Sequence, residues 1–141
     1  MTNFTKNLMA AAAALVVSAG LASAQTMLKA DVPFAFQVNG KVMSAGTYRV
    51  ANVSTNGVPV FALRSDDGQS IVTLPGSSHD ADKAWRADRQ PRLAFECAAD
   101  NCALSQVWAG GDAPAYNIGH RKTVDINRHI AVVVMRPEKG D

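Results

Sequence analysis

Residues 46–74 read GTYRVANVSTNGVPVFALRSDDGQSIVTL, three partly apolar stretches separated by Asn56-Gly57 and Asp67-Gly68. Asn-Gly and Asp-Gly pairs accept the positive φ angles of two-residue hairpin turns. The pattern therefore predicts a three-stranded antiparallel meander. If each turn holds two residues, the first register pairs Val50 with Leu63, and the second pairs Leu63 with Val72.

Both registers place the same apolar side chains on one surface of the predicted meander. These residues are Tyr48, Val50, Phe61, Leu63, Val72 and Leu74. The opposite surface receives Arg49, Arg64 and Thr73. Because successive side chains of a strand point to opposite faces, a one-residue slip would scatter the apolar set. The agreement between the two turns therefore favours this sheet.

Residues 28–38 form a further predicted strand with apolar residues at every second position, namely Val32, Phe34, Phe36 and Val38. Pro33 has no N–H to donate, so the strand begins there or lies at a sheet edge. Asn39-Gly40 then predicts a tight hairpin turn. An apolar edge strand can pair with another subunit, so a homo-oligomer, if one forms, is expected through this N-terminal strand.

The two cysteines, Cys97 and Cys102, mark another predicted hairpin. In an exported protein such a close pair predicts a disulfide rather than a zinc site or a thiol-exchange centre. If Cys97 faces Cys102, then Phe95 faces Leu104 and Leu93 faces Gln106. One face of this hairpin would then carry Leu93, Phe95, Leu104 and Trp108.

Two later stretches complete the predicted fold. Residues 130–135 are six consecutive apolar residues rich in valine, which favours a strand buried on both sides. Residues 75–91 are polar, and they form either a surface loop or a short helix that Ser78 caps and that includes Trp85. The fold class is therefore predicted as all-β, a small antiparallel β-sandwich or partly open barrel, because two packed sheets are needed to bury all the apolar faces.

Residues 1–24 have the pattern of a secretory signal peptide. Lys6 precedes an uncharged stretch over residues 8–21, and Ala22-Ser23-Ala24 forms a small-x-small cleavage site before Gln25. The apolar part is shorter than the ~20 residues of a membrane span. We expect residues 25–141 to form a single β domain, exported to the periplasm or the cell exterior, with no membrane span.

The charge balance argues against nucleic acid as a partner. The chain has 14 Lys and Arg residues against 12 Asp and Glu residues. Binding to nucleic acid depends on clustered basic residues that neutralise phosphates. The densest basic stretch, Arg86, Arg89 and Arg92, is diluted by Asp82 and Asp88.

Catalytic patterns are weak in this sequence. Gly76-Ser77-Ser78-His79 lacks the second glycine of a nucleophile elbow. Candidate metal ligands are scattered, and no spacing places two of them on one face. They are His79, Asp80, Asp82, His120, Asp125 and His129. We therefore expect no enzyme, no cofactor and no metal. A metal-dependent enzyme that uses these histidines is the second alternative to the favoured function.

A glycan- or peptide-binding module is the first alternative to the favoured function. Trp85, Arg86, Arg89 and Tyr116 are candidate contacts for a glycan or a peptide, although Trp85 could instead cover the open end of the sheet core. The favoured function is an exported non-enzymatic envelope or extracellular protein that acts by surface interaction or self-association. Its partner would be a protein or a glycan.

Several blocks of the sequence resemble a group of small exported β-rich proteins without assigned function, of acidobacterial type. The blocks are Val32-Pro33-Phe34-Ala35-Phe36-Gln37-Val38, Ala45-Gly46-Thr47-Tyr48-Arg49-Val50, Leu93-Ala94-Phe95 and Leu104-Ser105-Gln106-Val107-Trp108. They cover most of residues 28–110 and are blocks of strands and turns. The resemblance implies a shared fold, and it implies no catalytic residues.

Overall fold

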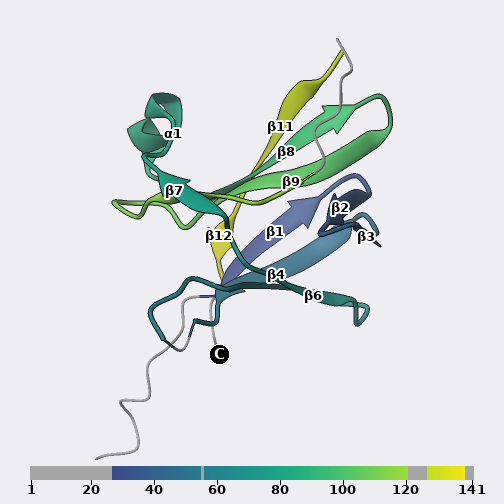
Figure 1. Cartoon of the computed structure of the whole chain (residues 1–141), viewed down its shortest axis with the longest axis horizontal. Helices are drawn as coiled ribbons and strands as arrows, with labels where there is room; N and C mark the ends of the chain where they lie inside the picture. The colour runs from purple at the N-terminus through teal and green to yellow at the C-terminus, as the bar shows by residue number, and fades with distance from the viewer. Residues whose placement is uncertain (1–26, 55, 121–126, 139–141) are drawn as a thin grey trace, which may run out of the picture.

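The computed structural model describes residues 27–54, 56–120 and 127–138, which form short strands in two sheets and one short helix (Figure 1). The signal peptide predicted over residues 1–24 lies outside the described residues. Within the described ranges, no helix is long and apolar enough to cross a membrane.

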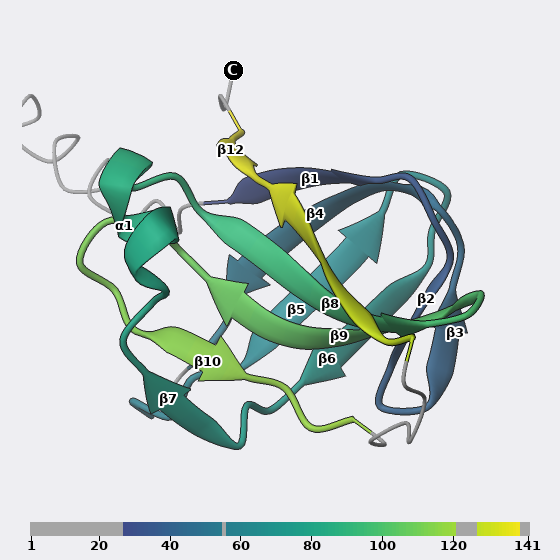
Figure 2. The same cartoon turned by 90° about the horizontal axis from the view of Figure 1, so that it is seen from above.

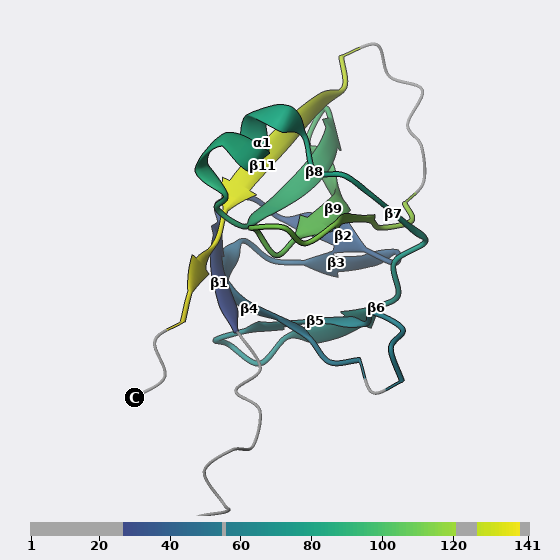
Figure 3. The same ribbon diagram turned by 90° about the vertical axis from the view of Figure 1, so that its left-hand side faces the viewer.

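The two sheets lie face to face as a sandwich (Figure 3). The first has the order β12-β1-β4-β5-β6. Its strands are β1 (Leu28–Val32), β4 (Gly46–Asn52), β5 (Phe61–Ser65), β6 (Ser70–Thr73) and β12 (Arg136–Pro137). The described strands do not close into a barrel, so the all-β prediction is confirmed in its sandwich form.

The second sheet follows the order β11-β8-β9-β10-β7, and a hairpin of β2 and β3 joins it beside β9. Its strands are β2 (Phe36–Val38), β3 (Lys41–Met43), β7 (Ser77–His79), β8 (Arg92–Ala98), β9 (Asn101–Trp108), β10 (Ala115–Asn117) and β11 (His129–Val134). Apolar side chains from both sheets meet between the layers and form the main core. Phe36 lies at its centre, where its ring packs edge-on against Tyr48 at 5.2 Å and Phe95 at 5.1 Å between ring centroids.

The N-terminal segment passes from one sheet to the other at Pro33. β1 ends at Val32 in the first sheet, and β2 begins at Phe36 in the second. The predicted alternation is confirmed, because Val32, Phe36 and Val38 are buried and Phe34 packs against the core. The single strand predicted over residues 28–38 is instead two strands, and β2 begins after Pro33, as one of the two alternatives has it. The other alternative, an edge position, is wrong for β1, which lies between β4 and β12 because the C-terminal strand returns beside it.

The predicted turn at Asn39-Gly40 is confirmed. Both residues have positive φ angles, 52° and 80°, and Val38 pairs with Lys41 across the turn. Positive φ at both central residues is the requirement of a type I′ hairpin turn.

The first register of the predicted meander is confirmed. Tyr48 lies opposite Ser65 and Val50 opposite Leu63 between β4 and β5. Tyr48, Val50 and Leu63 are all buried in the main core.

The second register is wrong by one residue. Leu63 lies opposite Ile71, and Val72 lies opposite Ala62. Thr73 is consequently buried, whereas Val72 and Leu74 point to solvent with 57% and 64% of their surface exposed.

A three-residue turn, rather than a two-residue turn, causes this shift. The N–H of Gly68 donates to the carbonyl of Ser65 at 3.3 Å, and the N–H of Ser65 donates to the carbonyl of Gln69 at 2.8 Å. Gly68 has a φ of 101°. This is a type I turn followed by a bulge at glycine, which adds one residue and reverses which residues of β6 face the core.

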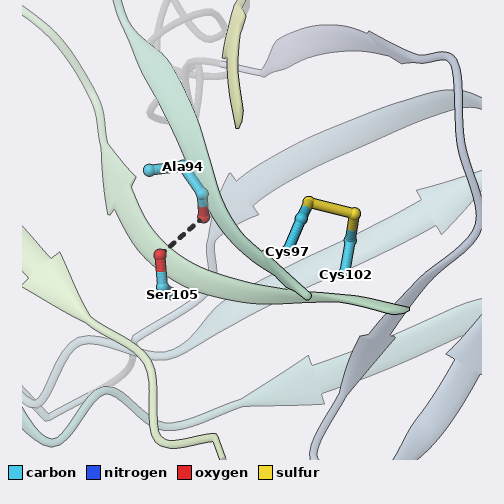
Figure 4. Close-up of a disulfide and its surroundings, with 4 residues drawn as sticks. All are labelled: Ala94, Cys97, Cys102 and Ser105. Carbon is cyan, nitrogen blue, oxygen red and sulfur yellow. Dashed lines mark hydrogen bonds between the residues drawn. A yellow bond between two sulfur atoms is a disulfide. The ribbon is translucent and has the colours of Figure 1, made fainter. Parts of the chain in front are cut away.

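The cysteine hairpin is confirmed at its tip. Cys97 lies opposite Cys102 and is bonded to it (Figure 4). Phe95 lies opposite Leu104. The connection is shorter than the four residues expected between the cysteines, because Ala98 pairs with Asn101.

Further along this hairpin the predicted register is wrong. The pairing shifts between Ala94 and Phe95, so Leu93 faces Val107 instead of Gln106. Ser105 is the extra residue of the bulge, and its Oγ donates to the carbonyl oxygen of Ala94 at 3.1 Å (Figure 4). Beyond the bulge Val107 faces the main core, and Trp108 joins a second apolar cluster rather than the predicted face.

The second cluster lies beneath the helix α1 (Lys83–Asp88). Trp85 of α1 stacks on Trp108 with 6.1 Å between ring centroids, so it does not cover the open end of the core. The predicted helix is present, but Asp82 caps it by accepting from the N–H of Ala84 at 3.3 Å. Ser78, the predicted cap, lies in β7.

Candidate functional site: an apolar strip on an edge strand

β11 is an edge strand that exposes every second side chain. It pairs with β8 and with no other strand among the described residues. Ala131 and Val133 pack against the core, whereas Ile130, Val132 and Val134 are 58%, 42% and 45% exposed. These three exposed residues are called the apolar strip. The prediction that residues 130–135 are buried on both sides is therefore wrong, since only one face of β11 is covered.

The apolar strip lies on the outer face of the second sheet. α1 covers part of that face, beside β8 and β9, and it leaves β11 uncovered (Figure 2). Natural edge strands are usually protected by charged residues, proline or bulges. β11 has no Lys, Arg, Asp, Glu or Pro between His129 and Val134. An uncharged, β-branched edge strand is a surface suited to association with another molecule.

An ion pair flanks each end of the apolar strip. At the start of β11, Arg128 lies 3.4 Å from Glu96, which is opposite Ile130 on β8. Beyond the other end, where the chain crosses into the first sheet, Nη1 of Arg136 in β12 lies 2.8 Å from Oδ2 of Asp31 in β1. The hydrogen bond from Arg136, together with one from Thr47 at 2.7 Å, lowers the pKa of Asp31 below its ordinary value, so this carboxylate is charged at neutral pH.

The C-terminal end of β11 is held against the rest of the fold. The N–H of Met135 donates to the carbonyl of Pro91 at 2.8 Å. The next residue, Arg136, lies opposite Lys29 in the antiparallel pairing of β12 with β1. The start of β11 diverges from β1 (Figure 2). Because β12 joins β1 at one end, the backbone edge of β11 is not open along its full length, whereas its outer face is.

Beside the apolar strip, Glu96 also borders a polar cleft of about 470 Å³. Glu96 accepts from Nε2 of His120 at 2.7 Å, and Nδ1 of His120 faces the carbonyl of Ile118 at 3.1 Å. Both ring nitrogens of His120 thus face oxygen atoms. The amide side chains that line the cleft are those of Gln37, Asn39 and Asn101.

The residues predicted to contact a ligand do not converge. Trp85 is stacked on Trp108 on the outer face, and Arg89, which ends α1, pairs with Asp112 at 3.2 Å. Arg86 lies exposed in the last turn of α1. Tyr116 faces the opposite way, since its ring packs on Phe61 at 5.4 Å on the core side of the sheet. Trp85 and Tyr116 therefore lie on opposite faces of the second sheet.

The candidate metal ligands are also separated. Among the described residues, no group of three or more His, Cys, Asp or Glu side chains is arranged to hold a metal ion. His79 contacts the carbonyl of Asp80 at 2.7 Å and the side chain of Asn117 at 2.9 Å. His129 is exposed at the start of β11. Asp125 lies outside the described residues.

Sequence reasoning missed the apolar strip as a site, although it identified the apolar run. Six apolar residues in a row show that a strand forms, but they do not show whether one face or both are covered. The signal that could have separated these cases is the pair of arginines, Arg128 and Arg136, that flank the run. Charges at both ends suit a strand whose ends and outer face reach solvent.

No protein-family model, no curated protein and no solved structure matches this chain. The resemblance to small exported β-rich proteins stays a prediction that depends on the blocks quoted above.

Proposed function

We propose that this chain is an exported, non-enzymatic envelope or extracellular protein that acts by binding a protein partner through the apolar strip. The single observation that carries the proposal is the exposure of Ile130, Val132 and Val134 side by side on one face of an edge strand. Burying a Val or Ile side chain fully contributes about 1.5–3 kcal/mol. Because Ile130, Val132 and Val134 are only about half exposed, burying the rest of each contributes about half of that value.

The partner is expected to pack on the outer face of β11 rather than to add a strand along its edge. The three exposed side chains of the apolar strip project outward from that face. An added strand would lie beside β11 and would cover only the sides of these side chains. The junction of β12 with β1 also limits the room beside the last residues of β11. Face packing therefore buries more apolar surface at this site than β-augmentation does.

Export is supported by the pattern of residues 1–24 and by the disulfide between Cys97 and Cys102, since such bonds persist in oxidising compartments. The test is the intact mass of the protein recovered from the periplasm or the medium. We expect a chain that begins at Gln25 and carries the disulfide. Recovery of the uncleaved chain from the cytoplasm alone would contradict export.

Site-specific photo-crosslinking in the producing cell tests the interaction. A photoreactive amino acid replaces Val132, and the matched control carries it at Val72, another exposed valine, which lies on the first sheet. We expect covalent protein adducts from position 132 and few from position 72. Equal adduct yields from the two positions, or none from position 132, would overturn the proposal.

A further inference from the structure

We infer that the partner of the apolar strip is a second copy of this chain, packed face to face about a two-fold axis at Val132. This inference rests on the proposed function and names the partner of the same surface. In this arrangement the two β11 strands run antiparallel across the interface. Ile130 of one copy meets Val134 of the other, and Val132 meets its own counterpart.

The spacing of the apolar strip is what suits a two-fold axis. Its three β-branched residues lie at equal intervals on either side of Val132, so reversing the strand reproduces the same apolar pattern. A surface that matches its own reverse is the requirement of a closed dimer with identical contacts from both subunits. If the axis lay at Ile130 or Val134, Val132 of one copy would face Arg128 or Arg136 of the other copy instead of an apolar side chain.

The charges at the two ends are complementary in the same arrangement. The axis brings the Arg128 end of one copy beside the Arg136 end of the other. Each end carries its own carboxylate, Glu96 or Asp31. Arg128 can therefore bond to Asp31 of the second copy, and Glu96 can accept from its Arg136. Each junction holds two positive and two negative charges, so the arginines do not repel across the interface.

The size of the apolar strip sets the expected strength. A standard stable interface buries about 800 Å² on each partner, which is more than three side chains and their flanking ion pairs supply. We therefore expect a dissociation constant in the micromolar range, about 10⁻⁶ to 10⁻⁴ M. At such values the dimer forms only where the protein is concentrated.

Sedimentation equilibrium of the exported protein, from a few micromolar to several hundred micromolar, measures its average mass in solution and so tests for the dimer. We expect the mass to rise from one chain to two. Val132→Lys should keep the protein monomeric over the whole range, and the matched control Val72→Lys should dimerise like the wild type. Arg128→Glu replaces a positive charge at each junction with a third carboxylate, so it should raise the dissociation constant of the dimer at least tenfold.

Cysteine crosslinking tests the axis without relying on affinity. The described part of the chain has no free cysteine, because Cys97 and Cys102 are bonded to each other. Under mild oxidation Val132→Cys should form a disulfide-linked dimer much faster than Val72→Cys. Ile130→Cys should crosslink poorly alone and well when mixed with Val134→Cys. Fast crosslinking of Ile130→Cys alone would reject the antiparallel arrangement.

The two proposals fail in different ways. A monomer at every concentration, with equal crosslinking at positions 132 and 72, overturns the second copy as partner. If photo-crosslinking in cells still joins position 132 to a different protein, the proposed function survives that result. If it joins position 132 to nothing, both proposals are wrong.

Discussion

Ser105 donates a hydrogen bond from Oγ to the carbonyl oxygen of Ala94 across 3.1 Å, at the point where the pairing of β8 and β9 shifts by one residue. Ser105 is buried, so this bond satisfies two polar groups away from water. The extra residue also decides that Val107 faces the core and that Trp108 lies under α1.

Ser105→Ala should lower the free energy of unfolding by about 1–2 kcal/mol, because the carbonyl of Ala94 loses a buried donor. Ser78→Ala, at an exposed position of β7, should change it by less than about 0.5 kcal/mol. Urea unfolding followed by tryptophan fluorescence measures both. A Ser105→Ala protein as stable as the wild type would show that the bulge does not depend on this bond.

Gly68→Ala should destabilise the protein by about 1–2 kcal/mol. Gly68 has a φ of 101°, which an L side chain rarely adopts, and the three-residue turn requires it. Gly76→Ala is the matched control, since Gly76 is exposed, has no such φ, and a Cβ there meets nothing within 4 Å. Equal unfolding midpoints in urea for the two variants would contradict the turn described here.

The attachment of α1 should depend on pH through Asp88. Arg92 donates two hydrogen bonds to this carboxylate, at 2.7 and 2.8 Å, and they lower its pKa from 3.8 to about 2. Because the folded-state pKa lies below the unfolded value, the stability it supplies is complete above about pH 4 and is lost as the pH falls toward 2.

Asp88→Asn removes this contribution. The difference in unfolding free energy between wild type and Asp88→Asn should be constant at neutral pH and shrink between about pH 4 and 2. Urea titrations at a series of pH values, read by the fluorescence of Trp85 and Trp108, measure it. A difference that stays constant or widens on acidification would refute this role.

Reduction of the disulfide should weaken the fold without abolishing it. The bond joins residues only five apart, so the loop-entropy relation gives a gain of about 2 kcal/mol. Cys97 is buried in the core, but that core is built from many other side chains of both sheets. Urea unfolding with and without a reductant should show a cooperative transition in both cases. A reduced protein without a transition would mean that the bond is essential to the fold.

Local turn chemistry and alternation predicted much of this fold, and each register error has the same physical origin. Tyr48, Val50 and Leu63 lie as predicted, because the first turn of the meander adds no residue to the register. The period-two pattern predicts the wrong faces for Val72 and Trp108, because one extra residue precedes each, at Gly68 and at Ser105. A single added residue exchanges the two faces of a strand, and a sequence pattern of period two does not reveal it.

The candidate site was less predictable than the fold. The apolar run of residues 130–135 correctly predicts a strand, but the neighbours of that strand in space are set by tertiary packing. β8 covers one edge of β11 and the core covers one face, whereas α1 falls over Trp108 and leaves Val132 bare. Tertiary packing also separates Trp85 and Tyr116, the predicted ligand contacts. They lie on opposite faces of one sheet.

The alternation along β11 is the basis of the apolar strip, and lysine substitutions at two adjacent valines test it most directly. At low protein concentration, Val132→Lys should change the free energy of unfolding by less than about 0.5 kcal/mol, because the new charge reaches water. Val133→Lys should cost more than about 2 kcal/mol, because that side chain packs against the core. Equal costs, or a greater cost at Val132, would contradict an outward-facing strip.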